Sequence, residues 1–495
     1  MKKVLTSLDN GLSWFRRFVS SDKFFYLVLA LFLIQALWFA ISVQPRLFDE
    51  PYHLKFIQRY AEQFSPFISN QGESWNSLGD VTRTPSYLYH YLLSWPLRGT
   101  QLVTDSHFAQ VFVLRLCNIA LVAGGLIVLR KLFQYVGSPA IVSNVVLLFL
   151  ILIPTFPTLA GAINYDNATF FILPLILLMI LKAMKSLKVD SAMLSGIVML
   201  SIFVVLVKYT VAVILLPILA IFVWKFFKKH RHGFVPAVIG SFKALSVSSK
   251  VLVVAGLLIS IGLFIERPVM NFISYNDITP SCERFRSQES CRENYTQARN
   301  FELLAKKPAD FKPFPPFEYF SALWFPSMVS TSFRMTPLQP VPSALHFMFF
   351  SGVILGILLI VYCLRDLLRT DTYKILLLVG LIFIAGVFAS NYASYKTFGA
   401  PVAMNGRYLL PALPFLLFFI ALSTYRLSVK KYKNITTAIL ILILLLFTQG
   451  GGIITSVAYL EPKEYWKNSR LTNINLKIGE AIRPYIKDNE KYLSF

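Results

Sequence analysis

Long apolar runs separated by short polar segments dominate the chain and indicate its fold class. Runs of about 20 apolar residues can cross a bilayer as helices. Eleven apolar runs are recognisable in the 495 residues, and the shorter ones must extend into their flanks to span. They cover residues 24–43, 108–129, 141–153, 169–181, 193–207, 211–224, 251–265, 345–364, 375–390, 408–424 and 436–457. This pattern predicts an all-α polytopic membrane protein with about eleven transmembrane helices.

A further segment, residues 87–97 (YLYHYLLSWPL), is apolar and aromatic but too short to span a membrane. It contains His90, and Pro96 is expected to break its end. Aromatic, amphipathic segments of this length usually lie in the interface between lipid and water. We therefore predict an interfacial helix in the first outer loop. If the segment were a span instead, every later helix would reverse its orientation.

The charge distribution decides between these two topologies. The chain carries 48 Lys and Arg against 25 Asp and Glu, a formal net charge of +23. With a cytoplasmic amino terminus and an interfacial segment 87–97, the cytoplasmic segments hold 23 basic and 5 acidic residues. These segments are 1–23, 130–138, 182–190, 225–250, 365–374 and 426–433. Because Lys and Arg accumulate on the cytoplasmic side of membrane proteins, the excess charge reports orientation in a lipid bilayer, and no nucleic-acid partner is expected.

This topology predicts one transmembrane domain over residues 1–457, with outer loops at 44–107 and 267–343 and a short outward tail at 458–495. Apolar residues make up 56% of the chain and charged ones 15%, which excludes a soluble globular enzyme. Two cysteines, Cys117 and Cys363, fall inside predicted helices as small apolar residues. Cys282 and Cys291 share an outer loop, where a local disulfide is favoured and two free thiols are the alternative.

Polar residues gather directly after the first apolar run. Asp49 and Glu50 are adjacent carboxylates, and His53 follows them, which suits acid–base chemistry or cation binding. Pro51 suits the first turn of a helix, so a solvated helix start is the alternative interpretation. In the next outer turn, Asp166 is either a helix N-cap or a second catalytic or metal-binding carboxylate.

Cations and hydrogen-bonding side chains lie in the same predicted outer segments. They are Arg83, His90, Lys208, Arg407 and Tyr408. A lysine between two apolar runs, such as Lys208, either snorkels to the interface or meets an anionic partner. Two carboxylate sites and at least three cations on one side of the membrane could hold a phosphate-bearing lipid and deprotonate an acceptor hydroxyl.

In their order and sidedness these motifs resemble the GT-C superfamily of integral membrane glycosyltransferases, which includes protein O-mannosyltransferases and lipid A aminoarabinose transferases. The resemblance covers roughly residues 24–430. It rests on Asp49-Glu50, Thr84-Pro85-Ser86-Tyr87-Leu88-Tyr89, Arg115-Leu116, Arg130-Lys131-Leu132-Phe133, Asn164-Tyr165-Asp166 and Gly406-Arg407-Tyr408-Leu409-Leu410-Pro411. Ser86 departs from the family's pattern, which has a second proline there.

The resemblance implies a GT-C-like fold and a glycosyltransferase. Such an enzyme moves a sugar from a polyprenyl-phosphate donor to a glycan or glycolipid acceptor on the outer face of the membrane. The resemblance makes Asp49 the catalytic base or a metal-bound carboxylate, supported by Glu50 and Asp166. Some members need a divalent cation, Mg²⁺ or Mn²⁺, which would here bind Asp49 and Asp166, and others need none.

Position and charge, rather than a shared motif, indicate Arg83, Lys208 and Arg407 as phosphate contacts, and they belong to a larger set of candidate substrate-binding residues. These are His53, Arg83, His90, Lys208, Arg407 and Tyr408. The composition, low in Ala and rich in Lys, Asn, Phe and Ile, favours a bacterial inner-membrane protein with its site facing the periplasm. Its target would be cell-envelope polysaccharide or lipopolysaccharide. Two alternatives stay open, namely an O-antigen polymerase or ligase and a polysaccharide or lipid transporter (flippase).

Overall fold

The computed structural model describes residues 13–46, 48–67, 73–186, 188–230, 233–332, 343–430, 457, 460–467 and 469–490. Within these ranges the regular secondary structure is helical, apart from an isolated antiparallel bridge between Val43 and Tyr465. The predicted all-α architecture is therefore confirmed.

Seven helical stretches within the described ranges are long and apolar enough to cross a membrane. They are Asp22–Ser42 (α2), His107–Tyr135 (α5), Tyr165–Lys185 (α8), Tyr209–Lys229 (η3 and α10), Val247–Tyr275 (α12, η4 and α13), Phe350–Leu367 (in α18) and Asp371–Phe398 (α19). Four shorter apolar helices are Ala140–Leu152 (α6), Ser191–Val207 (α9), Phe234–Ala244 (α11) and Leu413–Leu427 (in α20). Ten of the eleven predicted runs coincide with these helices, and the eleventh, 436–457, lies outside the described residues except for residue 457. Helix α11 was not predicted, because it lies inside residues 225–250, which the sequence predicts to be a cytoplasmic connection.

The composite stretches divide into η3 (Tyr209–Val211), α10 (Ala212–Lys229), α12 (Val247–Phe264), η4 (Ile265–Val269) and α13 (Met270–Tyr275), while α18 is Ser343–Leu367 and α20 is Leu413–Lys430. The remaining helices of the first half are α3 (Glu50–Glu62), η2 (Glu73–Thr82), α4 (Leu88–Gln101) and α7 (Thr155–Ala160). Those of the second half are η5 (Cys282–Arg284), α14 (Gln288–Arg292), α15 (Tyr295–Lys306), α16 (Pro316–Glu318), η6 (Tyr319–Trp324), α17 (Phe325–Ser332), η7 (Gly406–Leu409), η8 (Pro462–Glu464) and α23 (Arg470–Glu490).

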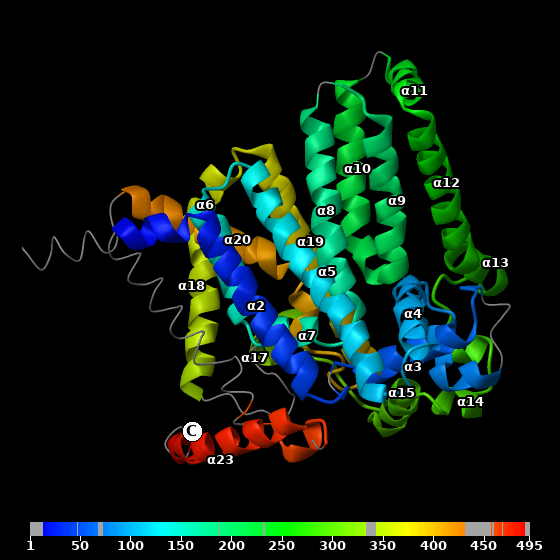
Figure 1. Ribbon diagram of the computed structural model, residues 1–495, viewed down its shortest axis with the longest axis vertical. Coiled ribbons are helices and arrows are strands. Elements are labelled where there is room, and N and C mark those ends of the chain that lie inside the picture. Colours follow the sequence, from blue (N-terminus) through cyan, green and yellow to red (C-terminus); the bar gives the residue numbers. More distant parts are fainter. Residues whose placement is uncertain are drawn as a thin grey trace, which may run out of the picture.

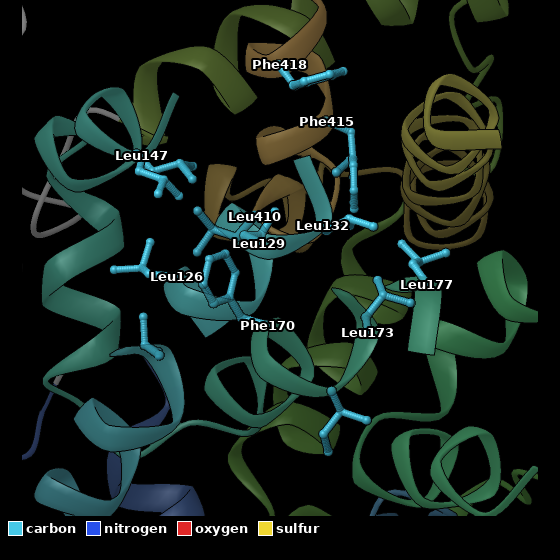
Figure 2. Packing of buried hydrophobic residues seen from close by; sticks show 14 of the residues in the cluster. Leu126, Leu129, Leu132, Leu147, Phe170, Leu173, Leu177, Leu410, Phe415 and Phe418 are labelled. Atoms are coloured by element: carbon cyan, nitrogen blue, oxygen red, sulfur yellow. The ribbon is translucent and has the colours of Figure 1, made fainter. Parts of the chain in front are cut away.

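The core of the bundle is built around the long contact between α5 and α8. Figure 2 shows Leu126 and Leu129 of α5 in one cluster with Phe170 and Leu173 of α8, and all four are buried. Gly125 permits this approach, because a Cβ there would lie 2.5 Å from the Phe170 ring and 2.9 Å from its carbonyl oxygen. Small residues at such contacts let membrane helices pack closely.

The predicted first outer loop contains α3, η2 and α4, and α3 packs on α4. Helix α4 contains the segment predicted to be interfacial, and it is not among the membrane-crossing stretches. The expected break at Pro96 is wrong, because Pro96 lies inside α4, where packing on α3 and α5 outweighs one lost backbone hydrogen bond. Phe64 and Trp95 are exposed aromatics near these helices, as is typical of the membrane interface.

The second outer loop packs against the first. Within it a disulfide joins Cys282 and Cys291, while Cys117 and Cys363 are free. Arg286 follows the first of the paired cysteines and donates a hydrogen bond to the Trp75 carbonyl at 3.2 Å. The two outer loops therefore form a continuous structure over the bundle.

Figure 1 shows α3, α4, α14, α15 and α23 at one end of the bundle and α11 at the opposite end. The predicted outer loops thus share one end, and a helix from the most basic connection lies at the other. Helix α23 lies across the outer-loop end, and the residues before it return to the end of α2 through the Val43–Tyr465 bridge.

Candidate functional site

A fully buried ion pair anchors the start of α3. Arg115 of α5 donates from Nε to Oε1 of Glu50 at 2.8 Å and from Nη2 to Oε2 at 2.7 Å, and both side chains are 0% exposed. The Ile163 amide also donates to Oε1 at 2.9 Å. Nη1 of Arg115 donates to the carbonyls of Ala40 and Val43. Fixed donors therefore occupy both carboxylate oxygens of Glu50, for which the sequence predicts a catalytic part.

Asp49 has the opposite environment. Its side chain is 62% exposed and forms an ion pair with Arg407, 358 residues further along the chain. Both Asp49 (φ 61°) and Phe48 (φ 55°) adopt the left-handed conformation. This costs a non-glycine residue roughly 1–3 kcal/mol and persists only where the surrounding structure enforces it. Asp49 occupies the N-cap position of α3 without capping the helix, so its carboxylate serves the contact with Arg407.

The η7 turn brings Arg407 to this place. Asn405 caps the turn by accepting a hydrogen bond from the Arg407 amide at 3.0 Å. Gly406 packs directly on α17, since a Cβ there would lie 2.5 Å from the Met328 carbonyl oxygen. The buried guanidinium of Arg407 then donates to the Tyr408 hydroxyl at 3.1 Å and to Asp49.

A second ion pair joins Asp166 to Lys208, and both side chains are buried. The N-cap of α8 is Asn164, whose side chain accepts from the Asp166 amide at 2.9 Å. The capping interpretation of Asp166 is therefore wrong, and its carboxylate is free to meet the lysine that ends α9. Lys208 has an anionic partner rather than a snorkelling side chain, as the alternative interpretation required. Its ammonium lies 5.1 Å from the centre of the Tyr165 ring.

Two buried histidines link α3 to α4. Nδ1 of His53 and Nε2 of His90 are 2.8 Å apart and share a hydrogen bond. Burial, with the nearby charges of Arg407 and Lys208, lowers the pKa of His53 to about 3. Burial and the neighbouring His53 also lower the pKa of His90 well below its usual value. Both imidazoles are consequently neutral at physiological pH.

These residues form one connected polar cluster. Its members are Asp49, His53, His90, Tyr165, Asp166, Lys208, Arg407 and Tyr408. Tyr165 lies in the middle, with its ring centre 4.8 Å from that of His53. Lys208 joins the two halves, because its ammonium lies 5.6 Å from the Tyr408 ring centre. Five chain segments, which carry residues 49–53, 90, 165–166, 208 and 407–408, thus converge at the end of the bundle that holds the predicted outer loops.

Arg83 is the predicted residue whose described contacts lie elsewhere. Its guanidinium lies over Tyr275 and Phe285 of the second outer loop, 5.4 and 5.8 Å from the ring centres. Conversely, sequence reasoning did not select Tyr165. Its position inside the Asn164-Tyr165-Asp166 motif was the available signal, since an aromatic residue beside a loop carboxylate can line the same site.

The cluster does not fit a divalent metal as it stands. Each of its two carboxylates already faces a cation, Arg407 for Asp49 and Lys208 for Asp166. Over the described ranges no group of three or more His, Cys, Asp or Glu side chains could hold a metal ion. The predicted Mg²⁺ or Mn²⁺ ligands, Asp49 and Asp166, belong instead to two separate ion pairs.

Comparison with known proteins adds a distant structural likeness. No protein-family profile matches the chain, and no curated protein sequence does. Among solved structures the chain is similar to the apo form of the oligosaccharyltransferase from Archaeoglobus fulgidus, with 13% sequence identity and a TM-score of 0.47. The match covers 96% of this chain and 60% of that chain, so this protein spans less than two thirds of that enzyme's length.

Proposed function

We propose that this protein is a GT-C-type membrane glycosyltransferase. It transfers a sugar from a polyprenyl-phosphate donor to a glycan or lipid acceptor of the cell envelope. The observation that carries the proposal is the polar cluster itself, in which two cation–carboxylate pairs surround Tyr165 beside a neutral histidine pair. Cations to hold a phosphate, a carboxylate to accept a proton and neutral groups to bind sugar hydroxyls are the parts that this reaction needs.

Arg407 and Lys208 bind the donor phosphate in this proposal. Both side chains are buried at the outer-loop end, where a low local dielectric strengthens their attraction to an anion. The planar guanidinium of Arg407 can hold two phosphate oxygens, and Lys208 adds a point charge. The Tyr408 hydroxyl, which accepts from Arg407, is within reach of the same ligand.

Asp49 is the catalytic base. It is the accessible carboxylate of the cluster, with 62% of its side chain exposed against 3% for Asp166. Asp49 removes the proton from an acceptor hydroxyl, whose oxygen then forms a bond to the anomeric carbon of the sugar. The bond from that carbon to the phosphate oxygen breaks, and its electron pair leaves on the polyprenyl phosphate held by the two cations.

The histidine pair binds sugar hydroxyls. Because both rings are neutral, they offer hydrogen-bond donors and acceptors without adding charge to a site that already holds two cations. His53 contacts Tyr165, so it lies beside the region where the donor phosphate would bind. The protein would work in the bacterial inner membrane with this end facing the periplasm, as the distribution of basic residues favours.

The test is sugar transfer from a polyprenyl-phosphate donor in membranes that contain equal amounts of each variant. Asp49→Asn and Asp166→Asn should each lose at least about 100-fold in rate, a typical scale for an acid–base or charge-positioning group. Asp105→Asn, at an exposed outer-loop carboxylate, is the matched control and should transfer normally. If both cluster variants retain full transfer, the assignment fails. Translocation of a lipid-linked glycan without any transfer would instead support the transporter.

A further inference from the structure

We propose that the C-terminal strap, residues 460–467, is a positioning element of the active site that holds Asp49 in its reactive geometry. The inference rests on the proposed function, because it takes Asp49 as the catalytic base. The strap is more than 400 residues from Asp49 in sequence, yet it pairs with the chain a few residues before it.

Main-chain hydrogen bonds fix the strap to the end of α2. The Gln44 amide donates to the Glu464 carbonyl at 2.8 Å, and the Trp466 amide donates to the Ser42 carbonyl at 3.1 Å. These two bonds flank the Val43–Tyr465 bridge. The Gln44 side chain adds a third bond, from Nε2 to the Tyr465 carbonyl at 2.7 Å. Three hydrogen bonds thus hold the residues from which the chain turns toward Asp49.

Buried side chains extend the contact from the bridge to Phe48. Tyr465 and Leu460 of the strap are 0% and 2% exposed. They form a small apolar cluster with residues of the α2 end and with Ala162, and Phe48 packs against that cluster. The strap therefore belongs to the apolar cluster against which the Phe48 side chain packs.

Phe48 transmits this support to the base. It precedes Asp49 directly, and both residues hold left-handed backbone conformations that need external support. On its other sides, the Phe48 carbonyl accepts from Asn164 at 3.0 Å, and the Arg407 guanidinium lies 5.9 Å from the ring centre. Removing a strap side chain from this cluster loosens the packing against Phe48, so the strained turn can relax and displace the Asp49 carboxylate within the site.

The contacts continue beyond the bridge. The Trp466 ring lies 5.2 Å from that of Phe108 at the start of α5. In α23, Asn475 accepts from Nε1 of Trp38 at 3.4 Å. The chain after the bridge is therefore held by further contacts, so a change at Tyr465 alters the packing against Phe48 without releasing the tail.

The experiment measures transfer kinetics of the full-length protein with a polyprenyl-phosphate-sugar donor. Tyr465→Ala should lower kcat about 10- to 100-fold, the scale of a misplacement near 1 Å, while KM for the donor changes less than about twofold. Tyr465→Phe should restore kcat, because the ring fills the same space. Ile474→Ala, at an exposed position of α23, is the matched control and should behave as wild type. In the Asp49→Asn background, Tyr465→Ala should cause no further loss in residual kcat.

Each outcome has a defined meaning. Wild-type kcat in Tyr465→Ala, or an equal loss in the Asp49→Asn background, overturns the positioning role. If Tyr465→Ala does not accumulate in membranes, Gln44→Leu decides, since it removes a single side-chain bond to the strap. A fall in its kcat supports the inference, and an unchanged kcat overturns it. Absence of transfer by the wild type refutes the proposed function instead, and is thus distinguishable from failure of the strap inference.

Discussion

The buried pair between Glu50 and Arg115 allows a test that separates structure from catalysis. We consider Glu50→Leu, Arg115→Leu and the double variant. Each single change leaves one charge buried at a place where both side chains are 0% exposed. The double change removes both charges and replaces them with apolar groups that the surrounding helices can pack against.

The structure sets the expected magnitudes. Removing one partner of a buried, hydrogen-bonded ion pair costs about 3–5 kcal/mol. The double variant also loses the donors to two backbone carbonyls and the acceptor of the Ile163 amide, and each such loss costs roughly 1–3 kcal/mol. Its total cost should still fall below the sum of the two single costs, with a coupling energy of about 2–3 kcal/mol.

Unfolding in detergent micelles measures these differences, with alkylation of Cys117 as a local probe. Cys117 is free and half-buried, two residues beyond Arg115 on α5. If Glu50 serves the fold, the double variant should regain part of the transfer activity that Glu50→Leu loses. Strictly additive stabilities would refute the ion-pair reasoning. A double variant with restored stability and no transfer would show that Glu50 takes part in the chemistry.

Three more predictions follow from particular contacts. In the native state the pKa of His53 is lowered to about 3. Below pH 6.5 the unfolded chain therefore binds a proton at this residue that the native chain does not bind. The free energy of unfolding should consequently fall by about 1.4 kcal/mol per pH unit from pH 6.5 toward 3. In His53→Asn, the free energy of unfolding should depend on pH less steeply, by the equivalent of about one proton. An unchanged slope would contradict the lowered pKa of His53. Lys208→Gln should reduce the transfer rate at least about 100-fold. Lys208→Arg keeps the positive charge beside Asp166 and should retain more activity. Equal transfer rates in the two variants would exclude a role for the charge. An impermeant maleimide should label Asp105→Cys but not Lys188→Cys in intact cells, since both residues are exposed, the first in the predicted outer loop and the second in a predicted cytoplasmic connection. The reverse labelling would invert the topology.

The sequence was enough to predict the helical architecture, because the length of an apolar run and the distribution of Lys and Arg are local properties. The first decides whether a helix can span a bilayer, and the second gives its expected orientation. It also predicted that Asp49, Lys208 and Arg407 share one side of the membrane, and the structure brings them into one cluster. It could not pair them, since the partner of Asp49 lies 358 residues away and depends on how η7 packs against α17. Local signals were equally ambiguous for Glu50, whose neighbour Asp49 has the same chemistry and the opposite environment.

The two errors at helix ends have a similar origin. Asn164 and Asp166 are both good capping residues, and only the folded chain shows that Asn164 caps α8 while Asp166 pairs with Lys208. Pro96 normally ends a helix, but the packing of α4 between α3 and α5 is a tertiary property. Arg83 was selected by its position and charge, and the aromatic rings that hold it belong to a segment nearly 200 residues away.

The ion pair between Asp49 and Arg407 has a consequence for the order of events. A single guanidinium cannot fully satisfy both a carboxylate and a phosphate, so an anionic headgroup that binds Arg407 competes with Asp49 for the same donors. By thermodynamic linkage, occupancy of the phosphate site and release of the carboxylate favour each other. In a lipid-phosphate-dependent transferase, the base would therefore become available when the donor arrives, and the resting site would be self-neutralised until then. Under the proposed function, this arrangement would favour ordered binding, donor before acceptor.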